Sequence, residues 1–232
     1  MERNIKFLVK FIEEEDYVDS LINHGELFLR PLGHFAKLEK DSSDEVRGDE
    51  REGLLLNSIR IGSNHPIYCM YSIFESDVLP DGLLIKKRAV ENFLSKETGY
   101  FAVIDYNNFI SSLKAKDFDG YAINADIVKY GSIDWEFQKE LFLSNRQLVA
   151  FVKRSDYSYQ QEFRLVVQKS LPMIKDVQMT KKYKKIHGDN FPHEIHNYSS
   201  YIVKIGSLQS FAKKYSINDL QDYDEKYFLL KN

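Results

Sequence analysis

Short apolar runs and alternating apolar and polar positions dominate the chain, and they predict many strands with short helices between them. Strands are predicted over residues 5–11, 26–30, 53–61, 66–74, 100–105, 120–130, 148–153, 162–168 and 201–205. Helical spacing predicts helices over 13–23, 89–97, 107–116, 134–144 and 207–215, with a helical turn or two over 31–40. The run 66–74 is apolar on both faces, which is typical of a central strand.

Helix boundaries are indicated by short polar residues and glycine. His24 and Gly25 stop the first helix, Asn107 or Asn108 lies near the cap of a later one, and Ser207 caps the last. The irregular order of strands and short helices predicts an α+β fold. We expect a single domain over 1–232, with a mixed or mostly antiparallel sheet and short flanking helices.

Two segments are predicted to be long surface excursions. Residues 39–52 are dense in both charge signs and nearly free of apolar side chains, which predicts a charged surface loop. Residues 172–200 are also poor in apolar side chains and hold two of the five prolines, a basic run and several histidines. No linker or internal repeat divides the chain.

Composition limits the partners that the chain as a whole can attract. The 232 residues carry a formal net charge of −3, so global attraction to nucleic acid or anionic lipid is not expected. The local basic run of Lys181, Lys182, Lys184 and Lys185 could neutralise phosphates. A solvated loop is the favoured interpretation of that run.

The single cysteine and the N-terminus indicate a cytoplasmic protein. Cys69 has no second cysteine to pair with, and its apolar surroundings predict a buried, inert thiol in a reducing compartment. The N-terminus lacks the apolar core of a signal peptide, and no apolar stretch is long enough to span a membrane. We therefore expect no membrane association.

A metal site is not expected. His187, His193 and His196 lie near Asp189 and Glu194 in the sequence, and these are ligand types that zinc accepts. The segment looks irregular, however, without the helical turn or hairpin on which zinc ligands usually lie. Cysteine pairs and the common phosphate-binding and nucleophile motifs are absent from the sequence.

A polar series within the strand-like segment 157–167 is the strongest functional signal. Strand alternation places one polar set on a single face, formed by Gln160, Glu162, Arg164 and Gln168. The apolar Phe163, Leu165 and Val167 then share the other face. A Glu two residues after a Gln can hold a sugar hydroxyl and offset positive charge on an anomeric carbon, while the amide orients the attacking group. The alternative is the wet face of an antiparallel sheet, with Glu162 and Arg164 paired to neighbouring strands.

The order and spacing of several segments resemble a family of phage and bacterial proteins of unassigned function. The resemblance covers about residues 1–170 and rests on residues 23–32, Phe35, Glu39, 47–49, 52–53, 68–72, Lys153 and 159–165. The resemblance favours a functional role for the charged loop. There, Arg47, Asp49 and Glu52 could serve a cation or a ribose, although such a run is more often solvated and self-paired.

The layout of that family is similar to the ADP-ribosyltransferase fold, with a closing Gln-x-Glu before an apolar strand. The resemblance implies that NAD is bound, with Glu162 on the nicotinamide-ribose hydroxyl and Gln160 orienting the acceptor. It further implies that Arg30 contacts the dinucleotide, that Ser72 is the strand serine, and that Arg164 and the charged loop border the cleft. Ser72 is a single Ser where the family has Ser-Thr-Ser, and Arg30 follows the first helix.

The resemblance implies a NAD-binding, ADP-ribosyltransferase-like protein that modifies a macromolecule in a conflict between phage and host. The alternative is a non-catalytic phage or prophage interaction protein, which would inhibit or trigger a host defence factor by surface binding. Both hypotheses imply a host or phage protein as partner.

Overall fold

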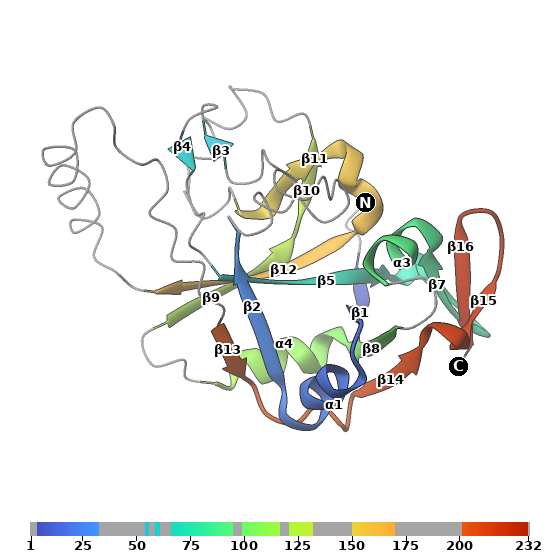
Figure 1. Ribbon diagram of the computed structural model, residues 1–232, viewed down its shortest axis with the longest axis horizontal. Coiled ribbons are helices and arrows are strands. Elements are labelled where there is room, and N and C mark those ends of the chain that lie inside the picture. The colour runs from blue at the N-terminus through green and yellow to red at the C-terminus, as the bar shows by residue number, and fades with distance from the viewer. Residues whose placement is uncertain are drawn as a thin grey trace, which may run out of the picture.

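An antiparallel sheet of eight strands organises the protein, as Figure 1 shows for the computed structural model. The structure describes residues 4–32, 54–55, 59–60, 66–94, 99–116, 121–131, 150–169 and 201–231. The strands of the sheet are β1 (Ile5–Ile12), β2 (Glu26–Pro31), β5 (Pro66–Phe74), β8 (Tyr100–Asp105), β9 (Tyr121–Ile127), β12 (Glu162–Lys169), β13 (Tyr201–Lys204) and β14 (Ala212–Ser216). One path through it is β13-β2-β5-β1-β8-β14, and β12 joins β5 to β9.

Strand β5 is central, as predicted, and one of its edges is shared by two strands. β1 pairs with the part of β5 from Tyr71 to Phe74, and β2 pairs with it at Pro66 and Ile67. Where β1 and β2 part, the ammonium of Lys10 donates a hydrogen bond to the Cys69 carbonyl at 2.8 Å. The lysine thus satisfies a backbone acceptor that none of the described strands covers at this point.

Apolar side chains cover both faces of the sheet. On one face, α1 (Glu15–His24) and α4 (Tyr106–Lys114) pack against a core that includes Leu8, Phe109 and Phe163. On the other lie α3 (Lys87–Phe93) and a smaller sheet, β15-β16-β7-β6. The strands of that smaller sheet are β6 (Val78–Leu79), β7 (Gly82–Lys86), β15 (Leu220–Asp222) and β16 (Tyr227–Lys231). Figure 1 shows α1 and α4 on the opposite side of the sheet from α3.

Short elements complete the described fold. β3 (Leu54–Leu55) pairs with β4 (Ile59–Arg60), and β10 (Lys129–Gly131) runs parallel to β11 (Val152–Arg154). The 3-10 helices are η1 (Glu75–Asp77), η3 (Ser155–Gln160) and η5 (Ile217–Asp219). None of the helices in the described ranges is long and apolar enough to cross a membrane.

The α+β class and the mostly antiparallel sheet are confirmed, while some element predictions are wrong. The helix predicted over 207–215 is instead a loop followed by β14, because β8 offers an edge with which Ala212–Ser216 pairs. The N-cap of α4 is Asp105, whose carboxylate accepts a hydrogen bond from the Asn108 backbone at 2.9 Å. The charged loop 39–52, the helix over 134–144 and the excursion 172–200 lie outside the described residues.

Gly25 is required where α1 ends, because its backbone has a left-handed φ of 64°. A Cβ built at this position would lie 2.0 Å from the carbonyl oxygen of Gly206. We expect Gly25→Ala to destabilise the protein by about 2–3 kcal/mol, from left-handed strain plus displacement of backbone. Urea denaturation would measure this. Gly131→Ala is the control, because its Cβ would meet nothing within 4 Å, and an equal loss in both variants would contradict the expectation.

Candidate functional site

A turn between η3 and β12 builds the candidate site. Gln161 occupies the left-handed region, with φ 41°, and reverses the chain between the 3-10 helix and the strand. Two bonds fasten this turn to β5: the Ser72 N–H donates to the Gln161 carbonyl at 2.8 Å, and Gln161 Nε2 donates to the Ser72 carbonyl at 3.0 Å. The strained backbone of Gln161 is therefore held in place by the central strand.

Gln160 does not lie on the strand face, which corrects the sequence prediction. It is the last residue of η3, and β12 begins at Glu162. Its side chain is nevertheless close to Glu162, because both residues contact Lys153. Lys153 Nζ donates to Gln160 Oε1 at 2.9 Å and lies 3.6 Å from Glu162 Oε2.

The Glu162 carboxylate is nearly buried and is held by two positive side chains. Arg164 donates to its Oε1 from Nε at 2.9 Å and from Nη2 at 2.7 Å. Glu162 is 5% exposed and Arg164 is 1% exposed. The wet sheet face that was the alternative prediction is therefore wrong: the two residues are buried and pair with each other.

Backbone contacts fix the position of Glu162 at the start of β12. Its N–H donates to the Tyr130 hydroxyl oxygen at 2.9 Å, and its carbonyl accepts from the Val128 N–H at 2.8 Å. Arg164 Nη1 also donates to the Ala150 carbonyl. The Glu162–Arg164 pair is thus held by β10 and by the segment just before β11. This is expected for buried charges, whose hydrogen bonds must be satisfied.

The surroundings lower the pKa of the Glu162 carboxyl to about 2. Burial alone would raise it, since the charged form is desolvated. The positive charges of Arg164 and Lys153, with hydrogen bonds from the Cys69 thiol and Arg164, outweigh burial. Glu162 is therefore an anion across the neutral range.

Two more groups beside the carboxylate have shifted proton affinities. Burial raises the pKa of the Cys69 thiol, and the charge of Glu162 acts in the same direction. The thiol is therefore protonated and can donate a hydrogen bond. Burial lowers the pKa of Lys10, which the charge of Glu162 opposes and that of Arg30 reinforces.

The other residues named from the sequence are placed differently. Ser72 follows Tyr71, which pairs with Glu162, so the Ser72 side chain lies on the opposite face of the sheet. Its hydroxyl is buried and has no hydrogen-bond partner among the described residues. Arg30 is exposed on β2, with its guanidinium 5.5 Å from the centre of the Phe28 ring. Arg47, Asp49 and Glu52 lie outside the described residues, as do Lys181–Lys185 and His187, His193 and His196.

Lys153 is the residue of this site to which the sequence assigned no role. It is 4% exposed, and its ammonium also lies 4.7 Å from the centre of the Tyr157 ring. The available signal was the position of Lys153 directly after the apolar run 150–152, which suggests burial. Lysines are rarely buried unless paired, so a buried lysine here indicates a carboxylate partner. Its carboxylate partner is nine residues away around a turn that the sequence did not predict.

Among the residues that the structure describes, no three His, Cys, Asp or Glu side chains are grouped so that they could hold a metal ion. Comparison with protein families, curated proteins and solved structures finds no match for this chain. What the site can do therefore follows from its own geometry.

Proposed function

We propose that this chain binds NAD and acts as an ADP-ribosyltransferase-like protein in a conflict between phage and host. One observation carries the proposal: Glu162, which is anionic at neutral pH, lies beside Gln160, and Lys153 contacts both. The biological setting rests on the resemblance to phage and bacterial proteins.

The low pKa of Glu162 favours one kind of chemistry over another. A carboxyl that is ionised at neutral pH cannot serve as a general acid there. It can accept a hydrogen bond from a ribose hydroxyl and stabilise positive charge that develops on the sugar ring. ADP-ribosyl transfer needs such a group, because the bond from the ribose anomeric carbon to nicotinamide breaks with its electron pair leaving on the nicotinamide.

The two carboxylate oxygens of Glu162 have different roles in this proposal. Oε1 accepts both hydrogen bonds from Arg164 and fixes the orientation of the side chain. Oε2 lies 3.6 Å from Lys153, beyond hydrogen-bond distance. Oε2 is thus the oxygen proposed to accept from a ribose hydroxyl, and Lys153 and the Cys69 thiol, which also donates to this carboxylate, would move aside as the sugar enters.

Arg30 is the cation that the resemblance assigns to the dinucleotide. It is exposed on β2, and a guanidinium suits the phosphates of such a ligand.

The test is transfer of label from NAD by the purified full chain. We expect the wild type to bind NAD and to label a macromolecule in a bacterial lysate, and Glu162→Gln to lower transfer by at least about 100-fold through loss of charge stabilisation. Glu91→Gln, at an exposed position of α3, is the matched control and should keep full transfer. Thermal denaturation checks that each variant is folded.

Two results would overturn the proposal. One is absence of NAD binding by calorimetry at about 1 mM, a limit that corresponds to very weak affinity. The other is transfer that persists in Glu162→Gln. Absence of NAD binding would favour the non-catalytic interaction protein, whose complex with a host factor should survive Glu162→Ala and Gln160→Ala.

A further inference from the structure

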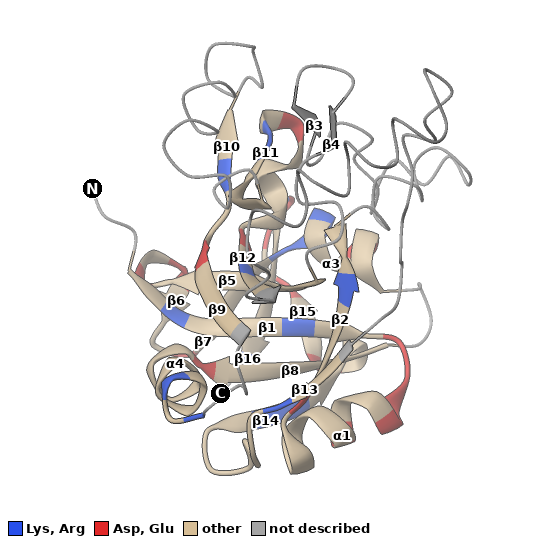
Figure 2. Ribbon diagram, turned by 90° about the vertical axis from the view of Figure 1, so that its left-hand side faces the viewer, with Lys and Arg blue, Asp and Glu red and all other residues tan. Residues whose placement is uncertain are grey.

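Strand β14 forms one edge of the large sheet, and its outer side is open among the described residues. β14 pairs with β8 alone in the described sheet. Figures 1 and 2 show β14 beside α1, at the opposite end of the fold from β10 and β11. It is thus remote from the candidate site.

The register of β14 defines which backbone groups point outward. The Asp105 N–H donates to the Phe211 carbonyl, and the Ile217 N–H donates to the Gly99 carbonyl. Hydrogen-bonded pairs alternate along an antiparallel ladder, so Lys213 and Tyr215 also bond to β8. The N–H and C=O groups of Ala212 and Lys214 therefore point away from β8. At Ser216 the outward N–H donates to Asp219 Oδ2 at 2.7 Å, which closes that end.

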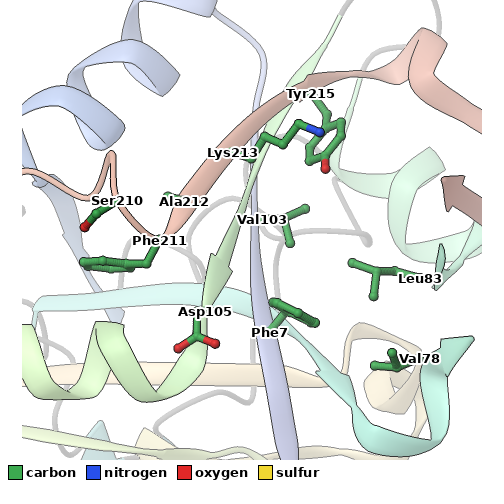
Figure 3. Close-up of a pocket in the computed structure, with 10 residues that line it drawn as sticks. All are labelled: Phe7, Val78, Leu83, Val103, Asp105, Ser210, Phe211, Ala212, Lys213 and Tyr215. Atoms are coloured by element: carbon green, nitrogen blue, oxygen red, sulfur yellow. The ribbon is translucent and has the colours of Figure 1, made fainter. Parts of the chain in front are cut away.

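A cavity of about 500 Å³ lies beside this edge. Its lining is mainly apolar and includes Phe7 and Val103 from the large sheet and Leu83 from β7. Figure 3 shows these side chains between Asp105 at one end and Lys213, which extends over Tyr215, at the other. The Lys213 ammonium is 4.8 Å from the centre of the Tyr215 ring. Because Lys213 and Tyr215 belong to β14, this edge strand forms one wall of the cavity.

We propose that β14 binds an extended segment of a partner protein, which adds a strand to the sheet and carries an acidic residue between apolar ones. The outward groups of Ala212 and Lys214 would bond the backbone of the segment. Its residue opposite Lys213 would be acidic, since opposite charges on facing positions stabilise a strand pair. The residues two before and two after it would share that face opposite Phe211 and Tyr215, which line the cavity, and would be apolar.

A second copy of this chain is a poorer occupant than an acidic segment. Antiparallel pairing of β14 with itself around Lys214 would set the two Lys214 residues directly opposite each other, which is unfavourable. It would also leave Lys213 opposite a tyrosine. Lys214 is already bonded to α1, at 2.9 Å from Glu15 Oε1 and 2.7 Å from Asp19 Oδ1. Lysines on an edge strand oppose self-association in this way.

The probe for this site is the capped peptide Ser-Leu-Thr-Glu-Thr-Leu-Ser, with a fluorescent label, titrated with the full chain. We expect saturable binding of the peptide, measured by fluorescence anisotropy. Lys213→Glu should weaken the affinity about fivefold. Changing the glutamate of the peptide to lysine should restore the affinity for the Lys213→Glu protein. Ala212→Pro should weaken binding at least about tenfold, because it removes an outward N–H while leaving the β8 ladder intact. Ala212→Ser keeps that N–H and is the matched control.

Several outcomes would overturn the proposal. One is no binding at about 1 mM protein, and another is binding that Ala212→Pro and the charge reversal leave unchanged. Dimerisation through β14, detected as a change in mass that Ala212→Pro abolishes, would assign the edge to a second copy instead. We expect these variants to leave NAD binding as it is in the wild type, because β14 is remote from the candidate site, so failure here is distinct from failure of the proposed transferase activity.

Discussion

Arg164→Met is expected to destabilise the protein by about 3–5 kcal/mol, because it leaves the Glu162 carboxylate buried without its main partner. Arg164 is 1% exposed and donates two hydrogen bonds to one carboxylate oxygen. Lys153, at 3.6 Å, is too far to replace them by a hydrogen bond. Urea denaturation at neutral pH would measure the loss.

The double variant Glu162→Gln/Arg164→Met separates the ion pair from general packing. Because it removes both charges, we expect it to be more stable than Arg164→Met alone, with a coupling of about 1–3 kcal/mol. Lys214→Met is the control at a partly exposed pair with Glu15 and Asp19, where the loss should stay within about 1 kcal/mol. A similar small loss at Arg164 would show that the buried pair does not stabilise the fold.

The apolar pattern predicted the strands of the sheet well, because that pattern is determined by whether one or both faces of a strand are buried. β5 was recognisable as central from its apolar run alone, and Gly25 indicated the end of α1. β14 was missed because Leu208 and Phe211 suggest helical spacing. Its identity depends instead on the edge of β8, which is distant in the sequence. Pairing between distant segments overrides local propensity in such cases.

The candidate site was only partly predictable for a related reason. Glu162 and Arg164 are two apart on one strand, so alternation correctly placed them on one face. Their burial was not predictable, because it depends on cover from residues such as Ala150 and Phe151 in another segment. The contact of Gln160 with Glu162 arises through a left-handed turn at Gln161, which is uncommon for a residue with a side chain.

The geometry also explains why the two proposed activities can coexist in one chain. The Glu162 cluster is buried and fastened to the central strand through Gln161 and Ser72. The β14 edge is at the periphery, where pairing with a further strand requires no change in the core. A partner bound at β14 could therefore be held while the carboxylate cluster stays intact, which is the arrangement expected of a protein that acts on a macromolecule.

Stability should fall in acid as Glu162 becomes protonated. The pKa of its carboxyl is about 2 in the folded protein against an ordinary value of 4.5. Between these values the unfolded chain binds the proton and the folded chain does not, so stability is present above about pH 4.5 and is lost as the pH falls toward 2. The difference corresponds to about 3 kcal/mol for this group.

Glu162→Gln isolates this contribution from that of other carboxyls. Urea denaturation of both proteins from pH 7 to about pH 2.5 should show a large stability difference at neutral pH that shrinks below about pH 4.5. The difference in free energy of unfolding shrinks in acid because the variant has no carboxylate at this position. The wild type loses its extra stability only when its own carboxylate is protonated. A difference that stayed constant across this range would mean that the Glu162 carboxyl has the same proton affinity folded and unfolded. The positive charges of Arg164 and Lys153 would then not be what keeps it ionised, and the role proposed for it as a fixed anion in the site would lose its basis.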